Sequence, residues 1–162
     1  MGFAHFAAGL AAKNVTPKIP LWVLLVASEL IDILWIIFAL VGIESLQYAP
    51  WSHSLFMAAV WSLIAGVAAW CIFKNGRSGL LIGLVVFSHW ILDFISHPMG
   101  AFGYGNQPDL PLFITGSTRV GLGLYNTAAL AYSIEFGLLA LGIVLYILWL
   151  RKQKKTSTII FR

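Results

Sequence analysis

The stretch FSHWILDFISHP, residues 87–98, ends one of the most apolar regions of the chain and carries His89, Asp93 and His97, each four residues after the last. On an α-helix this spacing places successive side chains on one face, with some drift over two turns. The residues around them are apolar, as expected for a helix in lipid. The stretch therefore predicts a membrane-embedded helix with one polar stripe.

The composition of the whole chain supports a membrane location. Of its 162 residues, 60% are hydrophobic and 10% are charged, and the mean hydropathy is +0.89, which lies far outside the usual range of soluble domains. A transmembrane helix needs about 20 apolar residues to cross roughly 30 Å of hydrocarbon. Four stretches meet this length: about residues 20–42, 53–73, 79–96 and 126–150.

A shorter apolar stretch, residues 2–12, precedes these spans. It is too short to cross, so we expect an interfacial helix or a half-helix tucked among the others. The predicted fold class is an all-α integral membrane protein with four transmembrane helices and this additional short helix. Residues 1–155 would form a single domain, and residues 156–162 a disordered tail.

Basic residues stand in short clusters beside the spans, as Lys13 and Lys18, as Lys74 and Arg77, and as RKQKK from residue 151. By the positive-inside rule, these clusters and both termini face the cytoplasm, and residues 43–52 and 97–125 face outside. The second outer segment, rich in proline and glycine, is predicted to act as a lid or binding segment. Because the charge reports topology, no nucleic acid partner is expected. The single cysteine, Cys71, excludes an internal disulfide.

Four of the six acidic residues fall inside predicted spans: Glu29, Asp32, Asp93 and Glu135. A central carboxylate costs about 3 kcal/mol on insertion scales, so such groups are normally turned inward and paired, protonated or bound to a cation. A rise of about 1.5 Å per residue puts many ionisable groups near one depth. That layer contains Asp32, His89 and Glu135, with Asp93 one turn higher, His53 and His97 near the outer rim, and His5 on the half-helix.

Facing stripes of histidine and carboxylate are a common way to build a metal site in a helical bundle. Imidazole with carboxylate suits zinc, manganese or iron(II), and zinc is our first choice. Taken singly, each residue is equally compatible with a hydrogen bond between helices. His97 stands at a helix end, and Glu135 is a natural partner for a tyrosine such as Tyr132 or for a helix neighbour. We expect His97 and Glu135 to contact the metal ligands without binding the metal themselves, and we expect Arg119 in the outer segment to bind a substrate anion or to face solvent.

Several motifs together resemble the YdjM-like family of inner-membrane metal-dependent hydrolases. They are HFAAG (residues 5–9), the acidic first span, WSHS (residues 51–54) and SHWILDFISHPMG (residues 88–100). The resemblance implies a small helical protein of a bacterial-type inner membrane with hydrolytic activity. It also implies a metal held by residues that match the family's polar positions: His5, Asp32, His53, His89 and Asp93.

The function that we predict is hydrolysis by a metal-activated water at a site that opens to the outer face. Glu29 is the candidate general base, and an amphipathic, lipid-like ester or phosphoester is the expected substrate. A transporter that uses the same layer to move protons or cations is the alternative, and a homodimer would supply its second half. A haem-binding electron carrier is a further alternative, less compatible with the carboxylates.

Overall fold

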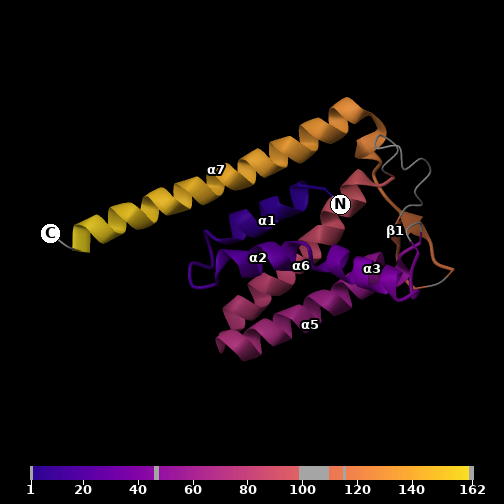
Figure 1. Cartoon of the computed structure of the whole chain (residues 1–162), viewed down its shortest axis with the longest axis horizontal. Coiled ribbons are helices and arrows are strands. Elements are labelled where there is room, and N and C mark those ends of the chain that lie inside the picture. The colour runs from indigo at the N-terminus through magenta and orange to yellow at the C-terminus, as the bar shows by residue number, and fades with distance from the viewer. Residues whose placement is uncertain (1, 46–47, 99–109, 115, 161–162) are drawn as a thin grey trace.

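The computed structural model describes residues 2–45, 48–98, 110–114 and 116–160. These residues form long helices that lie side by side, with two short strands at one end (Figure 1). The elements, in chain order, are α1 (Ala4–Ala12), α2 (Leu21–Ser28), α3 (Leu30–Leu40), α4 (Pro50–His53), α5 (Leu55–Phe73), α6 (Gly76–Ser96), β1 (Leu110–Pro111), β2 (Arg119–Val120), the 3-10 helix η2 (Leu124–Asn126) and α7 (Ala128–Ile160).

The helices confirm a largely helical membrane protein. Three of them are long and apolar enough to cross a bilayer: α5, α6 and residues 128–154 of α7. The first predicted span is not one straight helix, because α2 and α3 meet at an angle of 56°. The bent pair adds a fourth crossing if its two parts are counted together.

Helices α5 and α6 form a tight antiparallel pair. Ser54 caps α5 by accepting a hydrogen bond from the Met57 amide at 3.2 Å, and Asn75 caps α6 through the Arg77 amide at 3.0 Å. The helices cross closely at Gly79, where a Cβ atom would lie 2.6 Å from the Gly66 carbonyl oxygen. Small residues at such a crossing let two membrane helices approach each other.

Helix α1 is the half-helix that the sequence left open as one of two possibilities. It begins midway along the bundle, where the N-terminus is marked in Figure 1, and packs against α7, α2 and α6. The approach to α2 is close, since a Cβ atom at Gly9 would lie 2.7 Å from the Leu24 carbonyl oxygen. Ala4, His5 and Gly9 are buried by these contacts, so α1 carries His5 into the interior.

Part of the predicted lid, residues 97–125, covers one end of the bundle, which we call the strand end. The antiparallel pair β1 and β2 was not predicted. Backbone hydrogen bonds fix this segment to the helices, from the Phe56 amide to Leu112 at 3.1 Å and from the Leu122 amide to Phe94 at 2.8 Å. Residues 99–109 and 115 of the predicted lid lie outside the described residues.

The last helix is longer than the sequence suggested. Residues 156–160, predicted to be a disordered tail, continue α7 as helix. Its apolar part ends before the basic cluster from Arg151, and the helix continues beyond that cluster. Residues 161 and 162 of the predicted tail lie outside the described residues.

Candidate metal centre

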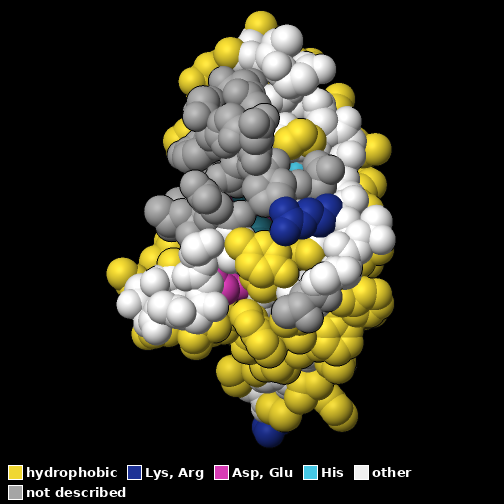
Figure 2. Space-filling view, turned by 90° about the vertical axis from the view of Figure 1, so that its right-hand side faces the viewer, with side chains coloured by type: hydrophobic (Ala, Val, Ile, Leu, Met, Phe, Trp, Pro, Cys, Tyr) yellow, Lys and Arg dark blue, Asp and Glu magenta, His cyan; other side chains and the backbone are white. Residues whose placement is uncertain are grey.

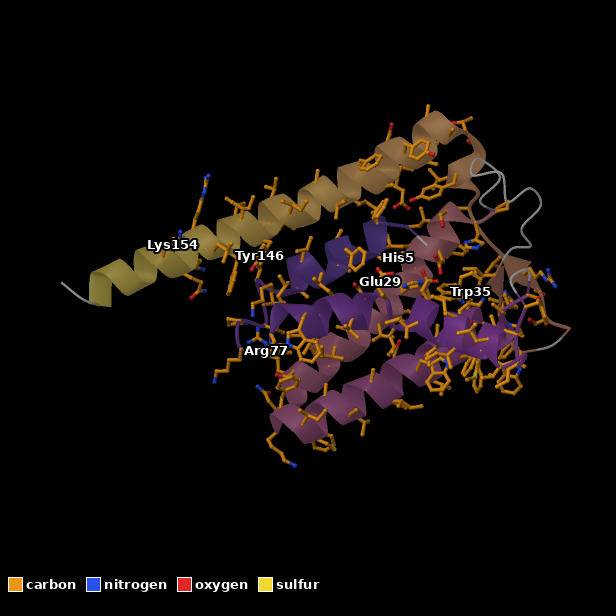
Figure 3. All side chains as sticks on the ribbon, viewed as in Figure 1. His5, Glu29, Trp35, Arg77, Tyr146 and Lys154 are labelled. Atoms are coloured by element: carbon orange, nitrogen blue, oxygen red, sulfur yellow. The ribbon has the colours of Figure 1, made fainter. Side chains whose placement is uncertain are left out.

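The five predicted metal ligands come together in the half of the bundle nearer the strand end. They come from four helices: His5 from α1, Asp32 from the first turn of α3, His53 from the end of α4, and His89 and Asp93 from α6. In Figure 3, His5 lies at this level, close to Glu29 in the view. Four of the five are at most 4% exposed, and the side chain of His53 is 12% exposed. The cluster therefore has its access on the His53 side.

Four of these side chains form a closed ring in which nitrogen and oxygen alternate. His53 Nε2 lies 3.3 Å from Asp32 Oδ1 and 3.6 Å from Asp93 Oδ2. His89 Nε2 lies 3.7 Å from the same Asp32 oxygen and 3.4 Å from the same Asp93 oxygen. These separations are longer than a good N–H···O bond. Neighbouring ligand atoms of a tetrahedral zinc ion with bonds of about 2.0–2.2 Å are roughly 3.3–3.5 Å apart; two of the four separations lie in this range, and the other two are slightly longer. Two overlapping groups have ligand atoms that all lie within 4.8 Å of one another: Asp32, His53 and His89, and His5, His89 and Asp93.

The tautomer of His89 is fixed by its second ring nitrogen. His89 Nδ1 lies 2.7 Å from the carbonyl oxygen of Ser28. A carbonyl oxygen accepts but cannot donate, so Nδ1 carries the hydrogen. In the neutral ring Nε2 then has a lone pair that faces the two carboxylates. This is the arrangement of a metal-ligating histidine, whose other nitrogen donates to a backbone carbonyl.

His53 is oriented in the same way through a side-chain relay. The hydroxyl of Ser52 donates to Glu44 Oε2 at 2.7 Å and accepts from His53 Nδ1 at 2.8 Å. Glu44 Oε1 also accepts the amides of Trp51 and Ser52 at the start of α4, which fixes the short helix. His53 Nε2 is left with a lone pair towards Asp32 and Asp93.

The ring thus brings lone pairs of two imidazoles and two carboxylates together in a buried place. Asp32 Oδ2, Asp93 Oδ2 and His89 Nε2 have no hydrogen-bond partner among the described residues. Such an arrangement requires protons on the imidazoles or a cation between them. One divalent ion would balance the charge of Asp32 and Asp93, and the donor set of imidazole and carboxylate suits zinc, manganese or iron(II).

The break between α2 and α3 builds two parts of this site at once. The end of α2 leaves carbonyl groups without helical partners, and that of Ser28 accepts from His89. The new start of α3 places Asp32 in its first turn, where the helix dipole favours a negative charge. Irregular backbone at this depth is tolerated because the surrounding protein satisfies it.

Glu29, the predicted general base, occupies the break itself. It is the C-cap residue of α2 and also the N-cap residue of α3. Its carboxylate is half-buried, interacts electrostatically with His5, His89 and Asp32, and has one oxygen, Oε1, without a hydrogen-bond partner among the described residues. The structure therefore brings Glu29 beside the centre but outside the ring.

His97 follows α6 and touches the site through the backbone. Its Nδ1 donates to the Asp93 carbonyl oxygen at 2.9 Å, and the Gly123 amide donates to the His97 carbonyl oxygen at 2.6 Å. Burial lowers the pKa of His97 below its usual value. A neutral His97 thus links the end of α6 to the strand end.

Glu135 holds the start of α1. It accepts from the Ala4 amide at 2.9 Å and from the Tyr125 hydroxyl at 2.7 Å. Burial, followed by the nearby Glu135 carboxylate, raises the pKa of Tyr125, so its hydroxyl remains a donor. The sequence suggested Tyr132 as the tyrosine partner, and the tyrosine that donates this hydrogen bond is Tyr125. Glu135 acts on the site through the residue before His5.

Arg119 lies at the strand end, exposed, with its guanidinium 5.2 Å from the centre of the Tyr48 ring. Figure 2 looks onto this end and shows a basic side chain next to a small area of histidine. Arg119 therefore lies at the strand end against Tyr48, outside the ring.

Three residues of the site were missed by the sequence analysis: Ser28, Ser52 and Glu44. The serine directly before the histidine in WSHS was a usable signal for Ser52. Ser28 contributes a carbonyl group, which any residue carries, and Glu44 reaches Ser52 across eight positions of the chain. Neither has a local sequence signature.

Comparison with known proteins adds no identity. No protein-family model, curated protein or solved structure matches this chain. The family resemblance seen in the motifs is therefore a proposal, and the functional argument rests on the site.

Proposed function

We propose that this protein is a membrane-embedded, metal-dependent hydrolase with zinc as the first candidate metal. The observation that carries the proposal is the alternating ring of His53, Asp32, His89 and Asp93, with N···O separations of 3.3–3.7 Å. A divalent ion held there would polarise a scissile carbonyl or phosphoryl group and lower the pKa of a bound water towards neutrality. The family resemblance of the motifs points to the same chemistry.

The chain's own groups supply the remaining steps. Glu29 lies beside the centre, with one oxygen that has no hydrogen-bond partner in the part of the chain that the structure describes. It is our candidate to take the proton from the attacking water. His53 and His89 are held in the ligating tautomer by Ser52 and Ser28. Arg119 at the strand end is available to bind an anionic group of the substrate.

The substrate class follows from the position of the site. Access is on the His53 side, close to the end of the spans, where amphipathic molecules concentrate. An ester or phosphoester of a lipid-like molecule is therefore the substrate that we propose. Water-soluble esters would have to leave solvent to reach the ring.

The proposed topology has four spans, counting α2 and α3 together, and both termini in the cytoplasm. Arg77 and Lys154 lie at the end of the bundle opposite the strands (Figure 3), which by the positive-inside rule is the cytoplasmic end. The site would then open to the outer face of a bacterial-type inner membrane.

A transporter is the second candidate, favoured by one observation. The broken α2–α3 pair and the half-helix α1 are discontinuous helices that meet at the polar cluster, as in many transporters whose ion sites lie near the midplane. A haem carrier is disfavoured, because His5 and His89 stack with ring centroids 3.7 Å apart and leave no space for a porphyrin between them.

The test begins with the metal content of the protein purified in detergent, measured beside His89→Ala and Asp93→Ala. Ser62→Ala is the control, since Ser62 is buried in α5 and bonds only to the Ala58 carbonyl among the described residues. We expect zinc in the parent and the control and none in the two variants. No transition metal in the parent, even after zinc is added, would exclude the proposed hydrolase.

A second measurement separates the two candidates. A hydrolase releases fatty acid or phosphate from lipid vesicles, and a chelator stops the release. A transporter instead carries protons or divalent cations across the membrane of sealed liposomes without product formation. Flux without hydrolysis would replace the first candidate by the second.

A further inference from the structure

His5 lies next to the ring of His53, Asp32, His89 and Asp93 but is not one of its four members. Its imidazole stacks on that of His89, with centroids 3.7 Å apart and planes inclined by 11°. The two rings point at the same carboxylate but at different oxygens. His5 Nε2 lies 3.3 Å from Asp93 Oδ1, and His89 Nε2 lies 3.4 Å from Asp93 Oδ2.

This is the geometry of a carboxylate that bridges two ions. A bridging carboxylate gives one oxygen to each ion, and paired catalytic ions are about 3.5–4 Å apart. The stacked rings have a similar spacing, with centroids 3.7 Å apart, and the ligand atoms of His5, His89 and Asp93 all lie within 4.8 Å of one another. Asp93 Oδ2 already belongs to the ring, so Asp93 Oδ1 and His5 are left as a second, adjacent pair of ligands.

Glu29 supplies a third group on this side. Its carboxylate interacts electrostatically with His5 more strongly than with any other group. Glu29 Oε1 is buried and has no hydrogen-bond partner among the described residues, and the same holds for His5 Nδ1. Both residues thus carry a buried polar atom without a partner among the described residues, and such an atom indicates a ligand, because an unsatisfied buried polar group is otherwise costly.

The net negative charge of the cluster also favours a second divalent ion. Asp32, Asp93 and Glu29 together carry one negative charge more than a single divalent ion can neutralise. Within the described residues, the ion pairs of Asp32 and Asp93 are with histidines. A second ion removes the deficit without the protonation of an imidazole.

We propose a second divalent-ion site formed by His5, Glu29 and Asp93 Oδ1, which shares Asp93 with the ring site. The inference rests on the proposed function, since the ring must hold the first ion. Glu29 binds through one oxygen, and its other oxygen accepts the proton of the attacking water. The hydrolase is then a two-ion centre in which α1 contributes to the second ion alone.

The experiment measures how many divalent ions each chain binds and whether two bound ions are magnetically coupled. Bound metal is removed from the protein in detergent with a chelator, and the protein is then titrated with Mn²⁺. The number of Mn²⁺ ions bound per chain is measured, and an electron paramagnetic resonance spectrum is recorded for each sample. The parent is expected to bind two ions per chain and to show a magnetically coupled pair. His5→Ala and Glu29→Gln are expected to bind one ion and to show the signal of isolated Mn²⁺, and Ser62→Ala two.

The outcomes separate the two proposals. The ion that remains in each variant shows that the ring is intact and the protein folded. One ion per chain in the parent overturns the second site and leaves the proposed function standing. Two ions in the parent and still two in both variants overturn its placement. No bound ion in any sample overturns this inference together with the proposed function.

Discussion

Ser52 shows how one hydroxyl can decide which atom of a histidine is available. It donates to Glu44 and therefore can only accept from His53 Nδ1. The imidazole is left with Nε2 as its basic nitrogen, directed at Asp32 and Asp93. Each hydrogen bond of this series thus has one possible donor: His53 Nδ1 donates to the Ser52 hydroxyl, which donates to the Glu44 carboxylate.

Replacement of Ser52 by alanine removes the acceptor for His53 Nδ1–H. Loss of such an outer hydrogen bond typically weakens metal affinity by about 10–100-fold. We expect a decrease of this size for zinc, measured by competition with a chromophoric chelator. Ser62→Ala should leave the affinity unchanged. Equal affinities for Ser52→Ala and the parent would show that the relay does not orient a ligand.

At this scale the sequence predicted the groups that are costly in lipid. His5, Asp32, His53, His89 and Asp93 stood out because each needs a partner inside an apolar helix. The backbone carbonyl of Ser28 could not stand out, since a carbonyl has no side-chain identity. Which nitrogen faces which oxygen depends on such groups and was not predictable.

At the scale of single elements, the bend at Glu29 is the feature that organises the site. Residues 21–40 contain neither proline nor glycine, the usual causes of a kink. The bend instead accompanies the turn of the Ser28 carbonyl towards His89, a contact between residues far apart in the chain. Hydropathy therefore predicted the extent of this apolar helical segment and could not predict its break.

Helix α1 depends on Glu135, which accepts from the Ala4 amide at its start. Glu135→Ala removes this cap, a loss of about 0.5–2 kcal/mol for the helix end. We expect faster amide exchange in α1, measured by hydrogen–deuterium exchange and mass spectrometry, and unchanged exchange in α5. An α1 that stays as protected as in the parent would contradict the capping role.

The pairing of α5 with α6 depends on Gly79. A Cβ atom there would lie 2.6 Å from the Gly66 carbonyl oxygen and 2.8 Å from Trp70 Cβ, so Gly79→Ala forces the helices apart. We expect a destabilisation of about 1–3 kcal/mol, measured by unfolding in detergent. Gly137→Ala is the matched control, since nothing lies within 4 Å of the added atom. Equal losses in both variants would refute the close crossing.

For the whole molecule, the ring connects helices that the chain otherwise joins by loops. Its ligands come from α3, α4 and α6, and His5 adds α1. A ligand that binds the folded state alone stabilises it, by about 2.7 kcal/mol at a concentration 100-fold above Kd. A bound metal would therefore stabilise the packing of these helices in addition to its role in catalysis.

Removal of the metal should consequently lower the thermal stability of the protein. We expect Tm in detergent to fall on addition of a strong chelator and to recover with excess zinc. Asp93→Asn, which weakens the ring, should show little response to either reagent. A parent Tm that is indifferent to chelator and zinc would mean that no structural ion joins these helices.

The layer of polar groups was the part of the tertiary arrangement that the sequence could indicate. Helical rise and spacing put Asp32 and His89 at one depth. They could not place α4 so that His53 meets Asp32, because that depends on the contacts of Glu44 with Trp51 and Ser52. The strands at 110–111 and 119–120 lay in a segment without hydropathy periodicity and were not predicted.

The most direct test of the central claim is anomalous diffraction at the zinc absorption edge from crystals of the zinc-loaded protein. We predict a strong peak enclosed by His53 Nε2, His89 Nε2, Asp32 Oδ1 and Asp93 Oδ2. A map with no peak there, or with zinc bound elsewhere on the chain, would contradict the metal centre.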